Sequence, residues 1–338
     1  DVFLEACDKH AQKPAYSCMG QTLSFEDVER LTANFASYLQ NHTDLEVGDR
    51  IAIQLPNVLQ FPIAIFGAMR AGMVVVNTNP LYTAREMEHQ FNDSGAKALL
   101  ILANMAHLAE QVVPKTSIKH VIVTELADMH PFAKRLLINT VVKRVKKMVP
   151  AYSLPQALSF RDALALGAKK APTAVALSLD DTAVLQYTGG TTGVSKGAQL
   201  LQKNLVSNMM QVRELIVNIL DTDTEVVIAP LPLYHIYAFT VSLVMSDMGH
   251  ELVLIPNPRD IPGFVKELSR HKFTSFIGLN TLFVALCNNK DFTELDFSHL
   301  KHTLSGGMAL TEAAAATWKK VTACEVQEAY GLTETSPA

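Results

Sequence analysis

Short apolar runs alternate with amphipathic stretches along this chain. The runs have the length of strands and predict them at residues 51–55, 73–76, 98–101, 120–123, 182–186, 225–229, 251–255, 274–277 and 326–328. Ser24-x-x-Asp27 and Thr83-x-x-Glu86 are typical of helix starts, and Gly95 is expected to end the second helix. The alternation predicts an α/β protein with parallel sheets covered by helices on both faces. Ligand sites in such sheets lie beyond the carboxyl ends of the strands.

A segment rich in glycine and threonine, residues 187–197, follows the predicted strand 182–186 and reads Tyr-Thr-Gly-Gly-Thr-Thr-Gly-Val-Ser-Lys-Gly. Glycines let backbone N–H groups approach phosphate oxygens, threonine hydroxyls donate hydrogen bonds or ligate a metal, and a lysine supplies a point charge. A plain hairpin needs fewer loop residues and no such density of hydroxyls. A P-loop does not fit, because Gly197 follows Lys196 and residues 198–201 continue as strand.

A second motif, Tyr330-Gly331-Leu332-Thr333-Glu334, follows the predicted strand 326–328. Alone, it would be read as a strand end running into a capped helix. Together with the glycine loop it resembles the paired signatures of the adenylate-forming superfamily, which includes acyl-CoA synthetases, nonribosomal adenylation domains and luciferases. The order of the two motifs and their long separation are those of that family.

The resemblance implies a role for each matching residue. Tyr330 would stack on adenine, Thr333 would contact the α-phosphate, and Glu334 would help to hold Mg²⁺. Thr191 and Lys196 would act on the phosphates, with Thr191 a second candidate metal ligand. The remaining nucleotide-binding candidates in the two motifs are Thr188, Gly189, Gly190, Thr192, Gly193 and Gly331.

Two weaker matches lie between these motifs. Gly306 and Gly307 stand in a strand-to-helix turn that lines the adenine pocket in relatives, although such a turn is by itself usually only a turn. His235 ends a Leu-Pro-Leu-Tyr-His segment whose histidine lies near the carboxylate and the α-phosphate in relatives. A lone histidine after an apolar stretch is as readily structural, so both readings of His235 stay open.

The resemblance narrows to bacterial long-chain fatty acid–CoA ligases at residues 231–239 and 278–283. Amino-acid activators carry an acidic residue just after the histidine segment, whereas residues 236–239 here are uncharged. An apolar lining suits an alkyl chain, which gains about 0.8 kcal/mol per buried CH₂ group. Phe239 falls where some relatives keep an aromatic gate over the acyl tunnel, with an ordinary core position as the alternative, and Gly278 is a second candidate substrate contact.

The implied reaction has two steps and requires ATP, Mg²⁺, coenzyme A and a long-chain fatty acid. A carboxylate displaces pyrophosphate from ATP to give an acyl-adenylate, and the thiol of coenzyme A then takes the acyl group. Two alternatives stay open, a nucleotide- or acyl-adenylate-binding module without turnover and a fatty acyl-AMP ligase. The sequence departs from the commonest family pattern at Gly189, Ser195 and Gln202.

The family's organisation implies two similar parallel-sheet subdomains within a large N-terminal domain. Residues 51–212 would form the subdomain that ends in the phosphate loop, and residues 1–50 with 213–338 the one that carries the adenine-side and acyl-side motifs. Relatives continue past the second motif into a β-barrel subdomain and a C-terminal domain with the adenylation lysine, and both are absent here. We therefore expect this chain to be an N-terminal-domain fragment without activity of its own.

Composition further limits the number of hydrophobic cores, the kinds of partner and the compartment that are compatible with this sequence. A chain of 338 residues with 49% apolar content exceeds what one hydrophobic core usually holds. A net charge of −4 gives no general attraction to nucleic acid. The four cysteines are scattered without metal-ligand spacing, which favours a reducing cytoplasm. Arg70 interrupts the longest apolar stretch, residues 61–76, so no run predicts a membrane-spanning helix.

A basic stretch lies between the predicted strands at 120–123 and 182–186. Six Lys and Arg residues stand within residues 134–147, around an apolar stripe of Ile138, Val141, Val142, Val145 and Val149. Such a basic amphipathic helix over residues 134–149 could lie on the anionic inner face of a membrane, in peripheral contact. The alternative is a solvated helix that covers its own domain.

Overall fold

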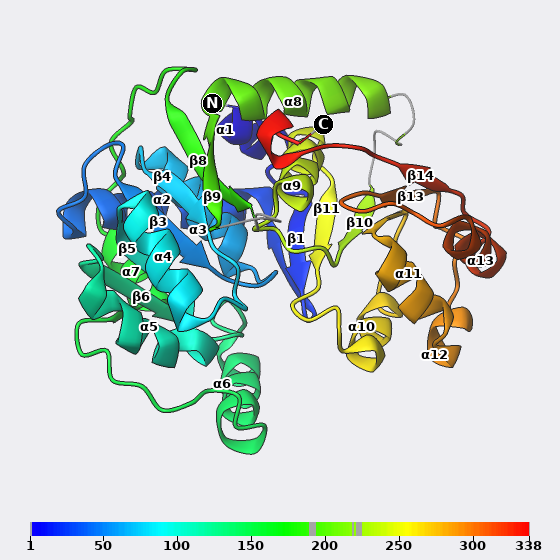
Figure 1. Cartoon of the computed structure of the whole chain (residues 1–338), viewed down its shortest axis with the longest axis horizontal. Helices are drawn as coiled ribbons and strands as arrows, with labels where there is room; N and C mark the ends of the chain where they lie inside the picture. The colour runs from blue at the N-terminus through cyan, green and yellow to red at the C-terminus, as the bar shows by residue number, and fades with distance from the viewer. Residues whose placement is uncertain (1, 189–193, 218–219, 221–224, 338) are drawn as a thin grey trace. The chain divides into compact units, whose positions relative to one another are not determined.

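The computed structural model of the chain describes residues 2–188, 194–217, 220 and 225–337 (Figure 1). It divides into two compact units, residues 27–203 and residues 1–26 with 204–338. These boundaries differ from the predicted ones at two places. Residues 27–50 belong to the unit that contains residues 51–203, and residues 204–212 belong to the unit that contains residues 213–338. Residues 27–42 lie in a helix that packs on elements of the 27–203 unit, since Gly67 approaches Phe35 and Arg70 donates to Thr32 Oγ1 at 2.8 Å.

The 27–203 unit is built on a seven-stranded sheet with the order β7-β6-β5-β3-β4-β8-β9 among its described residues. All neighbours are parallel except β8 and β9, which form an antiparallel pair. The strands are β3 Arg50–Gln54, β4 Val74–Asn77, β5 Ala96–Leu102, β6 His120–Thr124, β7 Leu158–Ser159, β8 Thr182–Thr188 and β9 Lys196–Leu201.

The helices associated with this sheet are α2 Phe25–His42, α3 Gln60–Arg70, α4 Ala84–Ser94, α5 Ala106–Val112, α6 Phe132–Thr140 and α7 Phe160–Gly167. Short 3-10 turns at Ala103–Met105 and Val113–Lys115 flank α5, and a π-helical turn at Val141–Val145 extends α6. The predicted capping box at Thr83 and Glu86 is present, and Gly95 ends α4 in the left-handed conformation. Met87 and Phe91 of α4 bury their side chains against the sheet in one apolar cluster.

The other unit also holds a seven-stranded sheet, with the order β14-β13-β12-β10-β11-β1-β2 among its described residues. Among the described strands of this unit, only β1 and β2 pair antiparallel. The strands are β1 Pro14–Cys18, β2 Gln21–Ser24, β10 Val226–Ala229, β11 Glu251–Leu254, β12 Ser275–Gly278, β13 His302–Ser305 and β14 Val326–Glu328.

The helices of this unit are α1 Val2–Lys9, α8 Gln202–Ile216, α9 Ile236–Met248, α10 Ile261–Leu268, α11 Asn280–Cys287, α12 Lys290–Thr293 and α13 Glu312–Thr322, with a 3-10 turn η4 at Thr333–Thr335. Trp318 of α13 is fully buried, with ring centroids 4.7 Å from Phe283, 5.0 Å from Phe276 and 5.5 Å from Phe292. This aromatic core packs strand β12 against the helices α11 to α13. In the described part of the chain, no helix has the length and apolar character needed to cross a bilayer.

Candidate functional site

Four neighbouring parallel strands of the second sheet bring sequence-predicted residues to one edge. His235 follows β10, Gly278 ends β12, Gly306 follows β13, and Tyr330 follows β14. The strands are adjacent in the order β14-β13-β12-β10. The carboxyl ends of parallel strands share one edge of a sheet, so the structure gathers residues that lie up to about a hundred positions apart in the sequence.

Backbone hydrogen bonds fix the relation between these strand ends. The Gly306 N–H donates to the Gly278 carbonyl at 3.3 Å, and the Ala329 N–H donates to the Ser305 carbonyl at 2.8 Å. The turn after β13 is thereby tied to β12 on one side and to the approach to Tyr330 on the other. The carboxyl ends of β12, β13 and β14 are therefore joined to one another by backbone hydrogen bonds.

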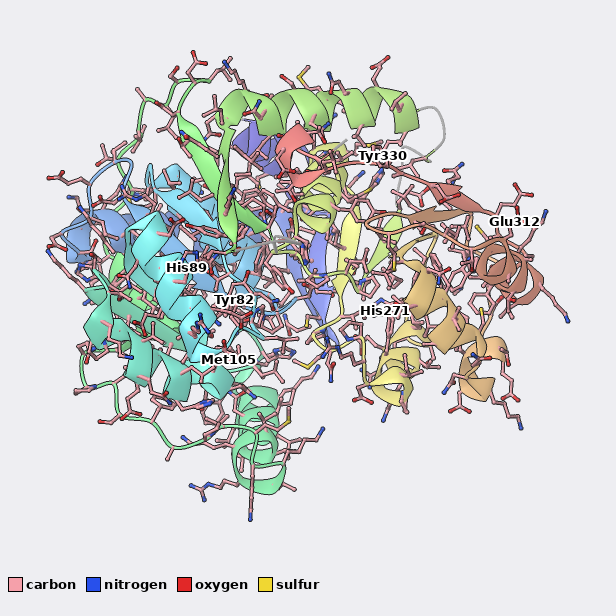
Figure 2. All side chains as sticks on the ribbon, viewed as in Figure 1. Tyr82, His89, Met105, His271, Glu312 and Tyr330 are labelled. Carbon is pink, nitrogen blue, oxygen red and sulfur yellow. The ribbon has the colours of Figure 1, made fainter. Side chains whose placement is uncertain are left out.

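Tyr330, Gly331 and Glu334 are presented to solvent. Tyr330 has 85% of its surface exposed, Gly331 and Glu334 are also exposed, and Thr333 is half-buried. Figure 2 labels Tyr330 just past β14. The exposed Tyr330 ring face is available to a base, as its predicted role requires, and the Thr333 side chain keeps part of its surface exposed.

Glu334 is the described metal-ligand candidate, and its surroundings fit Mg²⁺. Its carboxylate is exposed and forms no ion pair within the described residues. Those residues also hold no group of three or more His, Cys, Asp or Glu side chains that could hold a metal. Mg²⁺ in nucleotide sites is held by one or two carboxylates together with phosphate oxygens and water, so a single free carboxylate suits it.

His235 stands at the N-cap position of α9, yet its side chain makes no capping hydrogen bond. Its ring lies 4.8 Å from that of Tyr234. The residue is exposed, yet the protein atoms near the imidazole lower its pKa, because they penalise the charged form. His235 is therefore a neutral imidazole at neutral pH, which can accept or donate one hydrogen bond.

Packing inside the protein requires glycine at positions 306 and 278, and the sequence did not indicate this requirement. A Cβ on Gly306 would lie 2.7 Å from the ring of Tyr237, and a Cβ on Gly278 would lie 2.6 Å from the ring of Phe283. Both positions therefore need glycine for packing within the protein. Gly307 has a φ of +80° with open space around it, so backbone conformation explains that residue. A contact of this turn with adenine stays a prediction.

Phe239 is almost fully buried within α9, with 1% of its surface exposed. This is the core position that the sequence left as the alternative. A gating role over an acyl tunnel stays a prediction, as does a substrate contact at Gly278.

Two hydroxyls at this edge are candidates that the sequence did not suggest. The Tyr237 hydroxyl and the Ser305 Oγ are both buried without a hydrogen-bond partner among the described residues. Burial also raises the pKa of Tyr237, so it is a neutral donor. An unpaired buried polar atom costs about 1–3 kcal/mol, which a bound ligand could recover. Only the position of Tyr237, two residues after the histidine of the motif, could have suggested it.

In the 27–203 unit, two of the phosphate-loop candidates, Thr188 and Lys196, lie at the end of the β8–β9 pair. Thr188 ends β8 and is paired with Lys196, the first residue of β9. Lys196 is exposed, and the Ser195 Oγ donates to the Thr188 carbonyl at 2.7 Å. The connection spans seven residues, 189–195, more than a tight hairpin needs. Gly189, Gly190, Thr191, Thr192 and Gly193 lie outside the described residues.

Residues of α4 and of the segment just before it contact β8 and the residue that precedes β9. The sequence gave no indication of these contacts. The His89 Nε2–H donates to the Ser195 carbonyl at 3.0 Å, and the Tyr187 hydroxyl donates to Asp93 at 2.5 Å. The Tyr82 hydroxyl is hydrogen-bonded to the Ser195 side chain. We call His89, Asp93 and Tyr82 the α4 brace. These side chains contact Tyr187 in β8 and Ser195 just before β9.

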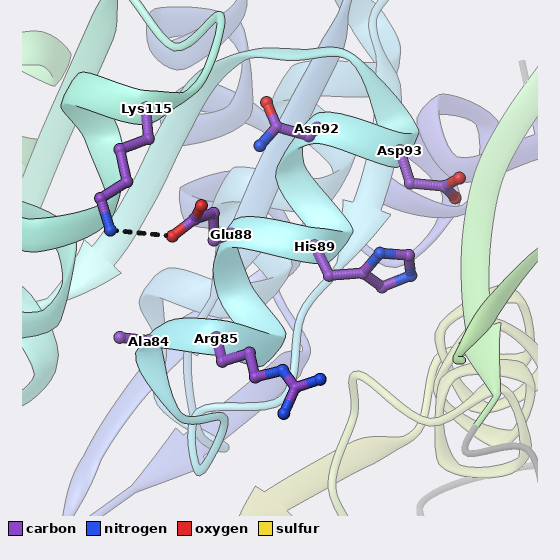
Figure 3. Close-up of a pocket in the computed structure, with 7 residues that line it drawn as sticks. All are labelled: Ala84, Arg85, Glu88, His89, Asn92, Asp93 and Lys115. Carbon is purple, nitrogen blue, oxygen red and sulfur yellow. Dashed lines mark hydrogen bonds and ion pairs between the residues drawn. The ribbon is translucent and has the colours of Figure 1, made fainter. Parts of the chain in front are cut away.

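The outer face of α4 forms a hollow of about 630 Å³ lined by Ala84, Arg85, Glu88, His89, Asn92, Asp93 and Lys115. Figure 3 shows His89 and Asp93 pointing to one side of the helix, while Glu88 points to the other and pairs with Lys115 at 3.1 Å. His89 and Asp93 of the brace therefore lie on one face of α4, and the Glu88–Lys115 ion pair belongs to a different face.

Comparison with known proteins assigns the chain to a family. Residues 3–338 match the family model described as AMP-binding enzyme. The chain is 48% identical over 338 residues to a long-chain-fatty-acid–CoA ligase of Escherichia coli O157:H7, covering 100% of this chain and 60% of that protein. It is 30% identical to the long-chain-fatty-acid–CoA ligase of Bacillus subtilis, covering 99% of this chain and 60% of the relative.

The fold has solved counterparts. The structure of a long-chain-fatty-acid-CoA ligase from Archaeoglobus fulgidus superposes with a TM-score of 0.82 at 21% identity, covering 100% of this chain and 64% of that one. This likeness confirms the predicted α/β architecture. The chain spans about 60% of the length of the curated relatives it matches.

Proposed function

The chain belongs to the AMP-binding enzyme family, and on this premise we propose that the whole protein ligates a long-chain fatty acid to coenzyme A at the expense of ATP. The observation that carries the proposal is the 48% identity, over the entire chain, to proteins that bear this name. The gathering of His235, Gly278, Gly306 and Tyr330 at one sheet edge supports it, because a nucleotide and an acyl group need several contacts at one place.

In the first step a fatty-acid carboxylate oxygen attacks the α-phosphorus of ATP, and the bond to the pyrophosphate oxygen breaks. Lys196 and Thr188 would contact the departing pyrophosphate, where negative charge builds. Thr333 and the neutral His235 would donate hydrogen bonds around the α-phosphate and the carboxylate. Tyr330 would hold the adenine by its exposed ring. Positioning and electrostatics account for the rate, and no protein nucleophile takes part.

Glu334 would be the protein's carboxylate ligand to Mg²⁺, with Thr191 the second candidate from the sequence. The ion would supply positive charge beside the phosphate oxygens as pyrophosphate leaves. In the second step the thiol sulfur of coenzyme A attacks the acyl carbon, and AMP leaves with the bonding electron pair.

The acyl chain would run along apolar side chains of α9 and the end of β12. Residues 236–246 carry no charged side chain, and Phe239 and Gly278 lie in this region. All four cysteines are free thiols, as is usual for proteins of a reducing compartment. We therefore propose that the protein acts in the cytoplasm, in peripheral contact with a membrane.

ATP–pyrophosphate exchange by the full-length protein against a series of fatty acids tests this proposal. Exchange that depends on long-chain acids, followed by acyl-CoA formation when coenzyme A is added, is the expected result. Exchange without acyl-CoA formation would instead indicate a fatty acyl-AMP ligase. Binding of acyl-AMP without exchange would indicate a binding module.

The α4 brace leads to a prediction on ATP. His89→Ala should raise the KM for ATP about fivefold, because about 1 kcal/mol of hydrogen bonding that holds Ser195 is lost. His89→Gln keeps a donor and should restore most of the affinity. Glu88→Ala, on the other face of the same helix, is the matched control. A KM for ATP unchanged in His89→Ala, or one that rises together with the KM for fatty acid, would contradict a role at the phosphate end.

The unpaired Tyr237 hydroxyl leads to a second prediction. Tyr237→Phe should leave the melting temperature equal or higher, because it removes a buried unsatisfied group, and it should weaken binding of a non-reactive acyl-adenylate analogue several-fold. Tyr16→Phe is the control, since the Tyr16 hydroxyl is bonded to Ser242 at 3.1 Å and Ser246 at 2.8 Å. That variant should lose stability and keep its affinity. A Tyr237→Phe protein that melts lower and binds the analogue normally would show a purely structural hydroxyl.

A further inference from the structure

Helix α6 turns an uncharged face to solvent. Along it, every exposed position is apolar or neutral, namely Phe132, Ala133, Leu136, Leu137 and Thr140. At 100° per residue these positions fall within one continuous arc of the helix. Phe132 is 69% exposed and Leu137 is 66% exposed, values far above those of core residues. Figure 1 draws α6 at the lower edge of its unit, beyond α5.

The segment after α6 is strongly cationic. Lys143, Arg144, Lys146 and Lys147 are all exposed and form no ion pair within the described residues. Val145, 71% exposed, and Met148, 50% exposed, stand among them. Residues 132–148 contain six Lys or Arg residues and no Asp or Glu. The exposed face thus combines bulky apolar groups with the four cations Lys143, Arg144, Lys146 and Lys147, which form no ion pair among the described residues.

The opposite side of the same segment is anchored to its unit. The Asn139 Oδ1 accepts a hydrogen bond from the Ala127 N–H at 3.0 Å, and Val142 is buried. The Met148 carbonyl accepts a hydrogen bond from Asn104 at 3.0 Å. Arg135 lies with its guanidinium carbon 5.4 Å from the centroid of the Phe132 ring. The predicted stripe is therefore split, because Val142 packs inward while Val145 faces solvent.

We propose that the exposed face of residues 132–148, with its apolar arc and its cations, docks on a bilayer surface that contains anionic phospholipids. Phe132, Leu136 and Leu137 would enter the boundary between headgroups and acyl chains, and Lys143, Arg144, Lys146 and Lys147 would contact the headgroup phosphates. This inference rests on the exposed face alone, and it holds whether or not the proposed reaction does.

Charge complementarity decides between a lipid surface and a second copy of the chain. Two copies meeting through this face would bring the four exposed cations of one copy against the four of the other, and residues 132–148 contain no acidic residue to separate them. An anionic bilayer offers negative charge beside an apolar layer, which is the pairing that this face presents. At the surface of such a membrane each Lys or Arg adds attraction that falls off within a Debye length.

Vesicle flotation with the full-length protein tests the proposal. Vesicles of phosphatidylcholine alone are compared with an equal mixture of phosphatidylcholine and phosphatidylglycerol. We expect binding to the mixture only, and its loss near about 1 M salt, where the Debye length is about 3 Å. Phe132→Trp adds a reporter, since the native Trp318 is fully buried. Its fluorescence should shift to the blue with the mixture and not with phosphatidylcholine alone.

Two variants separate the apolar and cationic contributions. Leu136→Ser with Leu137→Ser, and Lys143→Gln with Lys146→Gln and Lys147→Gln, should each lower the partition coefficient by about tenfold or more. The matched controls are Leu81→Ser with Leu179→Ser, which are exposed leucines of the same unit, and Lys9→Gln with Lys266→Gln and Lys320→Gln. Both controls should bind as the wild type, and all variants should keep the wild-type melting temperature.

Three results would overturn the proposal. The first is equal flotation of the wild type with both vesicle types. The second is wild-type binding by the Leu136/Leu137 variant, which would show general electrostatic attraction without docking of the arc. The third is a dimer in light scattering that this variant loses, together with no vesicle binding, which would assign the face to a second copy.

Discussion

Replacing Lys196 by alanine is expected to slow ATP–pyrophosphate exchange by the full-length protein by about one to two powers of ten. Lys196 opens β9 directly opposite Thr188, its side chain is exposed, and it forms no ion pair among the described residues. Its charge is therefore free for a phosphate. A charge-assisted hydrogen bond contributes roughly 1.5–3 kcal/mol, and each 1.4 kcal/mol or so of transition-state stabilisation changes a rate tenfold.

Two further variants make this result specific. Lys203→Ala removes an exposed lysine from the same unit, one already paired with Asp180 at 2.5 Å, and should leave the exchange rate unchanged. Lys196→Arg keeps the charge with a different shape and should retain more activity than alanine. If Lys196→Ala exchanges pyrophosphate at the wild-type rate, the lysine has no part in adenylation.

Local patterns in the sequence predicted much of the fold because they act over a few residues. The capping box at Thr83 and the left-handed Gly95 are each set by neighbours within one helical turn, and both are present. The predicted apolar runs all coincide with strands. The short strands β1, β2 and β7 were missed, and β1 is specified by pairing with β11, where Tyr16 lies opposite Leu252. A contact between residues so far apart leaves no mark in a local pattern.

The site was predictable where chemistry needs fixed neighbours and unpredictable where packing decides. The motif residues at the ends of β10, β12, β13 and β14 were found from their strings alone. The need for glycine at Gly306 depends on the Tyr237 ring, about seventy positions earlier in the chain. The α4 brace likewise depends on His89 meeting Ser195 through the fold. Such contacts follow from tertiary structure, which spacing in one sequence does not encode.

Glu334→Gln is expected to raise the Mg²⁺ concentration for half-maximal adenylation by about tenfold, because the amide keeps the size of the side chain but loses the charge that a hard cation prefers. Glu334 lies in the turn η4, which the Thr335 hydroxyl braces by donating to the Leu332 carbonyl at 2.8 Å. The Thr240 hydroxyl donates to the Ser336 carbonyl at 3.3 Å. Neither contact uses the Glu334 carboxylate, so the substitution should leave the turn intact.

The matched control is Glu328→Gln, which removes an exposed carboxylate of β14 two residues before Tyr330. It changes the net charge near the same sheet edge by the same amount, so a general electrostatic effect would appear in both variants. A Mg²⁺ titration of exchange shifted only in Glu334→Gln assigns the ion to that carboxylate. A titration of Glu334→Gln that overlays the wild-type curve would leave Glu334 as a part of the turn, and the metal ligand would then have to be sought elsewhere in the protein.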